Sequence, residues 1–316
     1  MLTFDVGHTH GRVSLTGVHG RELRSAQCRF DITTAPPEKV MHQLISLALK
    51  LMPGNTEERL IGIGVGLPGP ISPVTGLPGP IPILSGWHAY PILERIREHW
   101  DVPMVLENDA RALVLGEATQ HHGETLLGVK WSTGIGAGLI VGGTVAAGDD
   151  GAAGDIGHIK LTTSGPQCRC GRRGCLAAYA SGHTLLRELR ADGVKSLNDL
   201  VHRADEPKIN GLLDSAARKV GMVLASLIAM INPRTLVLGG IIGGLPNVVK
   251  VVDAQVRDIT LHRSTEALRI VPSELGERAA TVGLAQLIAA RVLAPEAIDR
   301  ALGAGVDTFG VPIGRA

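Results

Sequence analysis

The segment GDIGHIKLTTSGPQCRCGRRGCL, residues 154–176, carries the most specific chemical pattern in the chain. It holds one imidazole and three thiols that match the four ligands of a closed tetrahedral zinc site: His158, Cys168, Cys170 and Cys175. Gly171 and Gly174 permit the tight turns that so short a loop needs. Because no ligand position is left open for water, the pattern predicts structural rather than catalytic zinc. The alternative is three reduced, partly buried thiols.

The composition of the whole chain argues against several classes of protein. The 316 residues contain 31 Lys and Arg against 30 Asp and Glu, so the net charge gives no reason to bind DNA or an acidic membrane. The few aromatic residues (3 Trp, 2 Tyr, 3 Phe) disfavour a surface for base stacking. Apolar runs are far shorter than the roughly 20 residues that cross a bilayer, and no secretion signal is evident. We therefore expect a cytoplasmic protein without a disulfide scaffold.

Hydrophobic periodicity and turn residues predict a mixed α/β organisation that occurs twice. Strands are expected at residues 2–4, 13–15, 29–32, 60–65, 104–106, 126–131, 138–141 and 235–238. Helices are expected at residues 37–52, 92–100, 109–119, 176–189, 212–231 and 279–293. This order indicates two α/β lobes with a cleft between them. We assign residues 1–108 to a small lobe and 109–316 to a large lobe with the metal motif, and expect the helix near 279–293 to pack back near the small lobe.

Three glycine-containing segments could present backbone amides to an anion. They are the turn DVGHT at 5–9, the run TGIGAG at 133–138 between two strands, and the pair at 239–240 that closes a strand. Glycine lets the backbone approach a ligand closely, and successive amides can bind phosphate. Each segment is also explained as an ordinary turn, so none identifies a phosphate site by itself.

Asp109 follows a predicted strand and begins a predicted helix, so its carboxylate should face the cleft. One interpretation is an N-cap, for which Asp is well suited. The other is a general base, whose charged form the helix dipole would favour. The two roles do not exclude each other.

Taken in this order, the segments resemble the ROK family, which unites sugar kinases and sugar-responsive transcriptional repressors. GDIGH at 154–158 and CRCGRRGCL at 168–176 are similar to the family's E-x-G-H and C-x-C-G-x-x-G-C-L-E signature. LENDA at 106–110 is similar to its E-N-D-A segment, and STGIG at 132–136 to its G-T-G-I-G phosphate loop. The resemblance spans about residues 2–292. It implies the two-lobed actin-like ATPase (ribonuclease H-like) fold, with a mixed sheet in each lobe, closing on a sugar and MgATP.

The resemblance also implies roles for single residues. Asp109 would take the proton from a sugar hydroxyl that attacks the γ-phosphate. Phosphates, magnesium and adenosine would lie against Asp5, Gly7, Thr9, Thr133, Gly134, Gly136, Gly239 and Gly240. The sugar would meet Gly69, Asn108, Asp155 and His158. His158 would use one ring nitrogen for zinc and the other for the sugar, and the chain would assemble as a homodimer or homotetramer.

Five positions depart from the family pattern. The first loop, D-x-G-G-T-K in the family, has His8 in place of a glycine and His10 in place of the lysine. Asp155 replaces a glutamate, Ala177 replaces another, and Ile83 stands where an asparagine is frequent. The His8 ring is expected to weaken ATP binding. The lost hydrogen bonds would weaken a glucose-like ligand by about tenfold to a thousandfold or change the preferred sugar.

The sequence leaves more than one function open. An ATP-dependent kinase for a hexose or amino sugar is favoured by the retained Asn108-Asp109 pair. The sugar-sensing domain of a ROK-type regulator that lacks its helix-turn-helix, with little or no kinase activity, is favoured by the altered loops and by AAGDIGH at 152–158. A catalytically inactive sugar-binding protein is the third alternative. Nucleic acid would be a partner only if a DNA-binding segment preceded the first hairpin.

Overall fold

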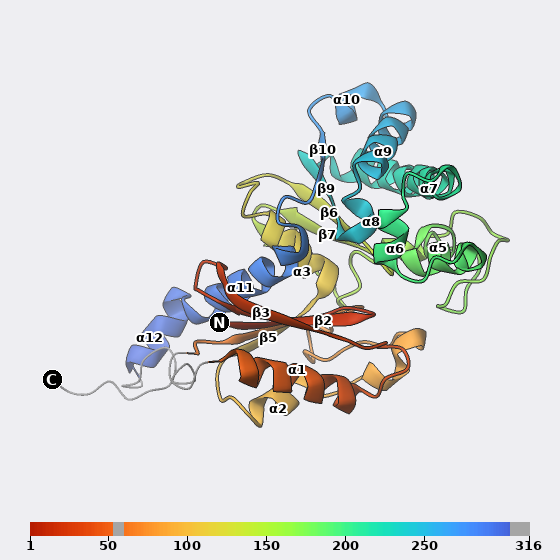
Figure 1. The fold of residues 1–316 in the computed structure, drawn as a ribbon. Coiled ribbons are helices and arrows are strands. Elements are labelled where there is room, and N and C mark those ends of the chain that lie inside the picture. The colour runs from red at the N-terminus through yellow and green to blue at the C-terminus, as the bar shows by residue number, and fades with distance from the viewer. Residues whose placement is uncertain (53–59, 304–316) are drawn as a thin grey trace.

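The computed structural model describes residues 1–52 and 60–303, which form two five-stranded sheets with helices packed on both (Figure 1). The strand orders are β3-β2-β1-β4-β5 and β10-β9-β6-β7-β8, and each sheet mixes parallel with antiparallel pairs. This architecture confirms the expected fold class. The expected large lobe ends at Ala316, of which residues 304–316 lie outside the described part.

The first sheet is built around β1 (Leu2–Val6), whose side chains are almost all buried. β1 pairs antiparallel with β2 (His10–Thr16) and parallel with β4 (Ile63–Leu67). β3 (Glu22–Arg29) and β5 (Met104–Asn108) form the two edges. Because β1, β4 and β5 run parallel, their carboxyl ends meet at one edge of the sheet, where Asp5 and Asn108 lie.

The second sheet repeats this plan around β6 (Leu126–Trp131). β6 lies between β9 (Thr235–Gly239), to which it is parallel, and β7 (Ile135–Val141), to which it is antiparallel. β10 (Arg269–Pro272) and β8 (Thr144–Val145) are the edges. The largest buried apolar cluster joins this sheet to the helices packed on it.

The helices cover the sheets and connect their strands. α1 and α2 pack on the first sheet, whereas α7 and α9 pack together beside the second. None of the helices within residues 1–52 and 60–303 has the length and apolar character needed to span a membrane. The helices, including short 3₁₀ turns, are α1 (Pro37–Leu51), η2 (Pro82–Trp87), α2 (Ile92–Arg97), α3 (Asp109–Glu117), η3 (Ile156–His158), α4 (Ala177–Ala180), α5 (Gly182–Glu188), η4 (Arg190–Asp192), α6 (Leu197–His202), α7 (Pro207–Ile231), α8 (Gly240–Gly243), α9 (Pro246–Ile259), α10 (His262–Thr265), η5 (Gly276–Arg278), α11 (Ala279–Val292) and α12 (Pro295–Gly303).

Two helices, α3 and α11, pack against each other between the sheets (Figure 1). Their backbones approach closely at two glycines. A Cβ at Gly116 would lie 1.9 Å from the carbonyl oxygen of Ala279, and one at Gly283 would lie 1.9 Å from that of Ala112. α3 also contacts β6 and β7, whereas α11 contacts β1 and β4. The pair therefore joins the two halves of the molecule.

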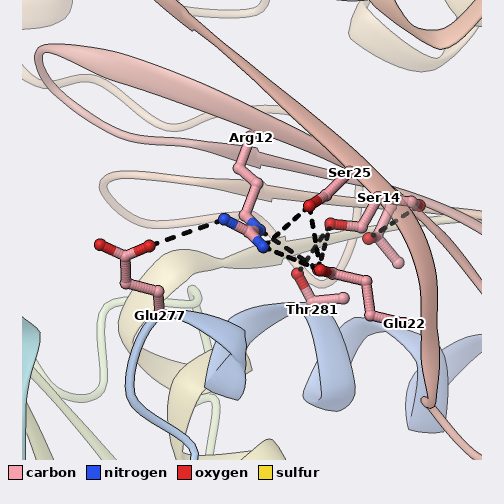
Figure 2. A network of polar contacts seen from close by, with 7 residues as sticks. Arg12, Ser14, Glu22, Ser25, Glu277 and Thr281 are labelled. Atoms are coloured by element: carbon pink, nitrogen blue, oxygen red, sulfur yellow. Dashed lines mark hydrogen bonds and ion pairs between the residues drawn. The ribbon is translucent and has the colours of Figure 1, made fainter. Parts of the chain in front are cut away.

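A polar network fastens the beginning of α11 to the first sheet (Figure 2). Arg12 pairs with Glu22 at 2.9 Å and reaches Glu277, before α11, at 3.6 Å. Ser14 donates to Glu22 and lies 3.5 Å from the hydroxyl of Thr281 on α11. Since Ser14 and Thr281 are buried, this contact fixes α11 against the strand from the inside.

Several elements differ from expectation. The strand expected at 29–32 is wrong, because β3 ends at Arg29. The helix expected at 176–189 is two helices, because Ser181 ends α4 and its hydroxyl caps α5 by accepting from Thr184. The glycine run at 133–138 is a turn only up to Gly134, and from Ile135 onward it belongs to β7. Short β8, β10, α6 and α10, and the longer α9, were not anticipated.

Candidate functional site

Two tight turns, one from each sheet, face each other beside the catalytic candidate. In the first, the amide of Gly7 donates to the carbonyl of His10, and His8 stands at its tip. In the second, Ser132 and Thr133 accept hydrogen bonds from the amides of Gly182 and His183. A Cβ at Gly134 would lie 3.6 Å from Cε1 of His8, so the His8 ring occupies space between the two turns.

His8 is neutral in this setting. Burial lowers the pKa of His8 to about 4, although the nearby Asp109 carboxylate opposes the shift. The ring therefore brings volume, but no charge, to the space between the turns at neutral pH. His10 is exposed, and its Nδ1 lies 3.4 Å from the hydroxyl of Thr9.

Asn108, and not Asp109, caps α3. Its side-chain oxygen accepts from the amides of Ala110 and Arg111, both at 3.0 Å, and its amide donates to the carbonyl of Gly69 at 2.9 Å. The N-cap interpretation of Asp109 is thus wrong. Because Asn108 takes the cap, the Asp109 carboxylate is free to point into the site. One N–H of Asn108 remains for a ligand.

Lys130, on β6, links the acidic groups of the two lobes. Its Nζ lies 3.0 Å from Oδ2 of Asp109 and 3.6 Å from Oδ1 of Asp5. Burial alone would lower the pKa of Lys130, but the two carboxylates outweigh it and raise the pKa above its ordinary value. The group is therefore an ammonium held between two carboxylates at the junction of the sheets.

The acidic cluster fits a magnesium ion. Within the described residues, Oδ1 of Asp5 is buried and accepts no hydrogen bond. Its ion pair with Lys130 is long, at 3.6 Å, so this carboxylate oxygen can still serve as a ligand for a hard divalent cation, which prefers oxygen. One ammonium between two carboxylates also leaves a net charge of about −1 in the cluster, which favours a further cation.

The third glycine segment lies next to this cluster. In the sheet register, Lys130 stands between Gly136 on β7 and Gly239 on β9. Gly240 has φ +79°, and a Cβ there would lie 2.5 Å from the carbonyl oxygen of Trp131. The structure therefore brings the segments predicted at Gly136 and at Gly239–Gly240 to the same end of one sheet.

Arg111 ties the beginning of α3 to the loop ahead of the metal motif. Its Nε donates to Glu107 at 2.7 Å, and its Nη1 donates to the carbonyl of Gly151 at 2.8 Å. Glu107 also accepts from the amide of Asn108. Since Arg111 is 2% exposed, this is a buried ion pair whose two members each lie two residues from Asp109 along the chain.

The cluster predicted to bind metal is assembled as expected. One ligand atom from each of His158, Cys168, Cys170 and Cys175 lies within 4.8 Å of the others. Nδ1 of His158 is 3.7 Å from Sγ of Cys168, and the sulfurs of Cys170 and Cys175 are 3.8 Å apart. Tetrahedral zinc with its usual bond lengths requires edges of about 3.6–3.8 Å, so the residues fit this ion. Nε2 of His158 is left for another partner.

The remaining positions assigned to the sugar lie on loops. Asp155 and His158 are exposed; Asp155 directly precedes the short turn η3, and His158 is its last residue. Gly69 has φ +97°, a backbone conformation that favours glycine, and its carbonyl is held by Asn108. Ile83 and Ala177, which depart from the family pattern, are partly buried among apolar neighbours.

Two functional candidates escaped the sequence analysis. Arg111 directly follows the LENDA segment and Lys130 lies two residues before the STGIG segment, but neither was assigned a role. The sequence did contain one indication for Lys130, which lies within the apolar strand expected at residues 126–131. A charged residue is rarely buried without a partner, so this lysine could have been expected to pair with an acidic group.

Comparison with known proteins gives a consistent result. The model of the ROK family matches residues 1–291. The glucokinase of Thermotoga maritima is 28% identical over 92% of this chain and 98% of its own length. The xylose repressor of Bacillus subtilis is 30% identical over 72% of this chain, and the match spans 61% of the repressor.

Solved structures agree on the fold. A ROK family glucokinase from Streptomyces griseus, crystallised with glucose and AMPPNP, superposes with a TM-score of 0.78 at 24% identity, over 91% of this chain and 99% of that one. Relatives of the chain thus include both sugar kinases and sugar-responsive repressors. The resemblance seen in the sequence is confirmed, and the chain belongs to the ROK family.

Proposed function

We propose that the protein is an ATP-dependent kinase for a hexose or amino sugar. The observation that carries this proposal is the convergence of Asp109, Asp5 and Lys130 between the two turns at residues 7–9 and 132–134. Phosphoryl transfer needs a positioned hydroxyl and neutralised phosphate charge rather than elaborate covalent chemistry. The similarity to the Thermotoga maritima glucokinase over nearly the full length of both chains supports the same activity.

In this reaction Asp109 accepts the proton of the attacking sugar hydroxyl. The sugar oxygen forms a bond to the γ-phosphorus, the bond from that phosphorus to the β,γ-bridging oxygen breaks, and ADP leaves. The amides of the two turns orient the phosphates. Magnesium, when bound through Asp5, supplies charge neutralisation for the phosphates. Asn108 caps α3 and so holds Asp109 at the first position of this helix.

We propose that the His158–Cys175 cluster holds structural zinc. Its four ligands fill a tetrahedral site, which leaves no position for a reacting water. With Nδ1 on the metal, His158 would present Nε2–H to a sugar hydroxyl, and the metal would fix the orientation of the ring.

A coupled ADP-release assay over hexoses and N-acetylhexosamines tests the kinase, with Asp109→Asn as the matched variant. General-base removal should lower kcat by about 10²–10⁴-fold. Calorimetry should show that the variant still binds the sugar. Absence of sugar-dependent ADP release by the unmodified protein, or equal turnover by the variant, rejects the proposal.

A second candidate is sugar sensing without turnover, and a specific observation favours it. The neutral His8 ring lies between the two turns, where triphosphate would have to pass. The 30% identity to the Bacillus subtilis xylose repressor is compatible with this function. Sugar binding by calorimetry together with no ADP release, in both the unmodified protein and His8→Gly, would establish sensing.

A further inference from the structure

We propose that Lys130 is a catalytic residue, the fixed cation that contacts the phosphoryl group during its transfer. The inference rests on the proposed kinase function and goes beyond it by assigning a residue outside the motifs of the family pattern. It is carried by the place of Lys130 in the sheet, its two carboxylate partners and the loss of a cation from the first turn.

The sheet register directs Lys130 toward the phosphate region. Lys130 stands between Gly136 and Gly239 in the two neighbouring strands, and the turn at residues 132–134 follows two residues later. Neither glycine has a side chain that would crowd the lysine. The lysine chain therefore extends to the junction of the lobes, where its ammonium meets Asp109 at the start of α3 and Asp5 of the first lobe.

The carboxylate partners mark where the ammonium lies relative to the reacting atoms. Asp109 contacts the sugar hydroxyl, and Asp5 stands at the phosphate turn, so a group 3.0 Å from one and 3.6 Å from the other lies between nucleophile and phosphate. An ammonium has three N–H donors. After one serves Asp109 at 3.0 Å, the others are available to phosphate oxygens.

The first turn has lost a cation that Lys130 replaces. His10 stands where the resembled pattern has lysine, and it is exposed, with its ring beside Thr9. His8 is neutral at physiological pH. A preorganised positive charge at the transferred phosphoryl is among the largest contributions to such reactions, and Lys130 supplies it here.

The opposite role for Lys130 would be restraint of the base, in which the ammonium holds Asp109 and suppresses turnover. The ion pair is made through Oδ2 of Asp109. Oδ1 of Asp109 therefore remains for the sugar hydroxyl. A loose transition state also depends more on charge neutralisation than on base strength. Restraint is accordingly the outcome that would overturn the proposal.

The test uses the full chain and three variants. Lys130→Met removes the charge and keeps the shape, Lys130→Arg keeps the charge, and Lys208→Met is the control, because Lys208 is 68% exposed and pairs with Asp192 on the surface. The measurements are kcat and sugar KM, and calorimetric binding of inorganic tripolyphosphate without added magnesium.

We expect Lys130→Met to lower kcat by about 10²–10³-fold with unchanged sugar KM. It should weaken tripolyphosphate binding by about tenfold or more. Lys130→Arg should retain most of that binding, which also covers the case in which the methionine variant fails to fold. Lys208→Met should match the unmodified protein.

Higher kcat in Lys130→Met would show restraint and overturn the proposal. Unchanged tripolyphosphate binding in a folded Lys130→Met, or loss of that binding in a folded Lys130→Arg, would overturn it as well. If the unmodified protein releases no ADP but Lys130→Met loses tripolyphosphate, the kinase proposal fails while the phosphate contact of Lys130 stands.

Discussion

Replacing Arg111 with methionine should both destabilise the protein and disturb its sugar site. Arg111 is 2% exposed, and its guanidinium satisfies Glu107 and the carbonyl of Gly151. The variant leaves the Glu107 carboxylate, 13% exposed, without its cation. Breaking one side of a buried ion pair costs about 3–5 kcal/mol of unfolding free energy, because the remaining charge stays desolvated.

Urea denaturation of Arg111→Met, Glu107→Gln and the double variant measures this effect. We expect a loss of about 3–5 kcal/mol for Arg111→Met and a smaller loss for the double variant, since removing both partners leaves no unpaired charge. The matched control is Arg95→Met, whose pair with Glu98 is solvent-exposed and should contribute little to the unfolding free energy. A loss below about 1 kcal/mol for Arg111→Met, or strictly additive losses, would refute the argument.

The same variant should weaken sugar binding. Arg111 holds the loop around Gly151, which precedes Asp155 and His158 by only a few residues. A Cβ at Gly151 would lie 1.9 Å from the carbonyl oxygen of Ile71, so the loop is also seated closely on the first lobe. Calorimetry should show a higher sugar Kd in Arg111→Met. An unchanged Kd would show that the ion pair does not position the sugar-binding loop.

Three further predictions concern metal, packing and pH. Elemental analysis should find about one zinc per chain, lost together with stability in Cys170→Ser, and equal stability without metal would contradict structural zinc. Gly283→Ala should lower the unfolding free energy by about 1–3 kcal/mol, because its Cβ would lie 1.9 Å from the carbonyl oxygen of Ala112; unchanged thermal unfolding would exclude the close helix contact. Burial lowers the pKa of His8 from 6.5 to about 4 in the folded protein. As the pH falls from 6.5 to about 4, the unfolded chain therefore binds a proton at His8 that the folded protein does not. The unfolding free energy should decrease over this range, by at most about 3 kcal/mol. His8→Gln should remove that part of the pH dependence. If denaturation shows that the unmodified protein and His8→Gln lose the same unfolding free energy between pH 7 and pH 4.5, this prediction is refuted.

The sequence predicted the parts of the fold that local patterns encode. α1 and the first hairpin follow from periodicity and turn residues, and the cysteine spacing anticipated the ligand cluster. The end of α4 at Ser181 was not predicted from the sequence, because a serine within an apolar helical pattern can equally be an interior residue of one helix. Only the structure shows that its hydroxyl caps α5. Gly136 was assigned to a turn because the glycine run lacks a local signal for where a strand resumes.

The site was predictable only as far as its residues belong to contiguous motifs. The catalytic role of Asp109 stays a prediction. Its N-cap interpretation was wrong because Asn108 and Asp109 both qualify as N-caps, and the contact of Asn108 with Gly69 selects between them. Lys130 meets Asp5 across the lobes, 125 residues away along the chain, and Asp109 within its own lobe, 21 residues away. No spacing rule links them, because the sheet register and the junction of the lobes create the contact.

Two features of the proposed site have opposite effects on ATP binding, and their free energies can be compared. The His8 ring takes up space between the turns, but it is neutral, and even a Cβ added at Gly134 would lie 3.6 Å from its Cε1. Moving such a side chain away from its preferred rotamer costs about 0.5–1.5 kcal/mol. A hydrogen bond from the charged Lys130 to a phosphate contributes about 1.5–3 kcal/mol, and it acts at the reacting group itself. The attraction that we propose for Lys130 would therefore offset the displacement of His8, so the His8 ring is compatible with the proposed kinase function.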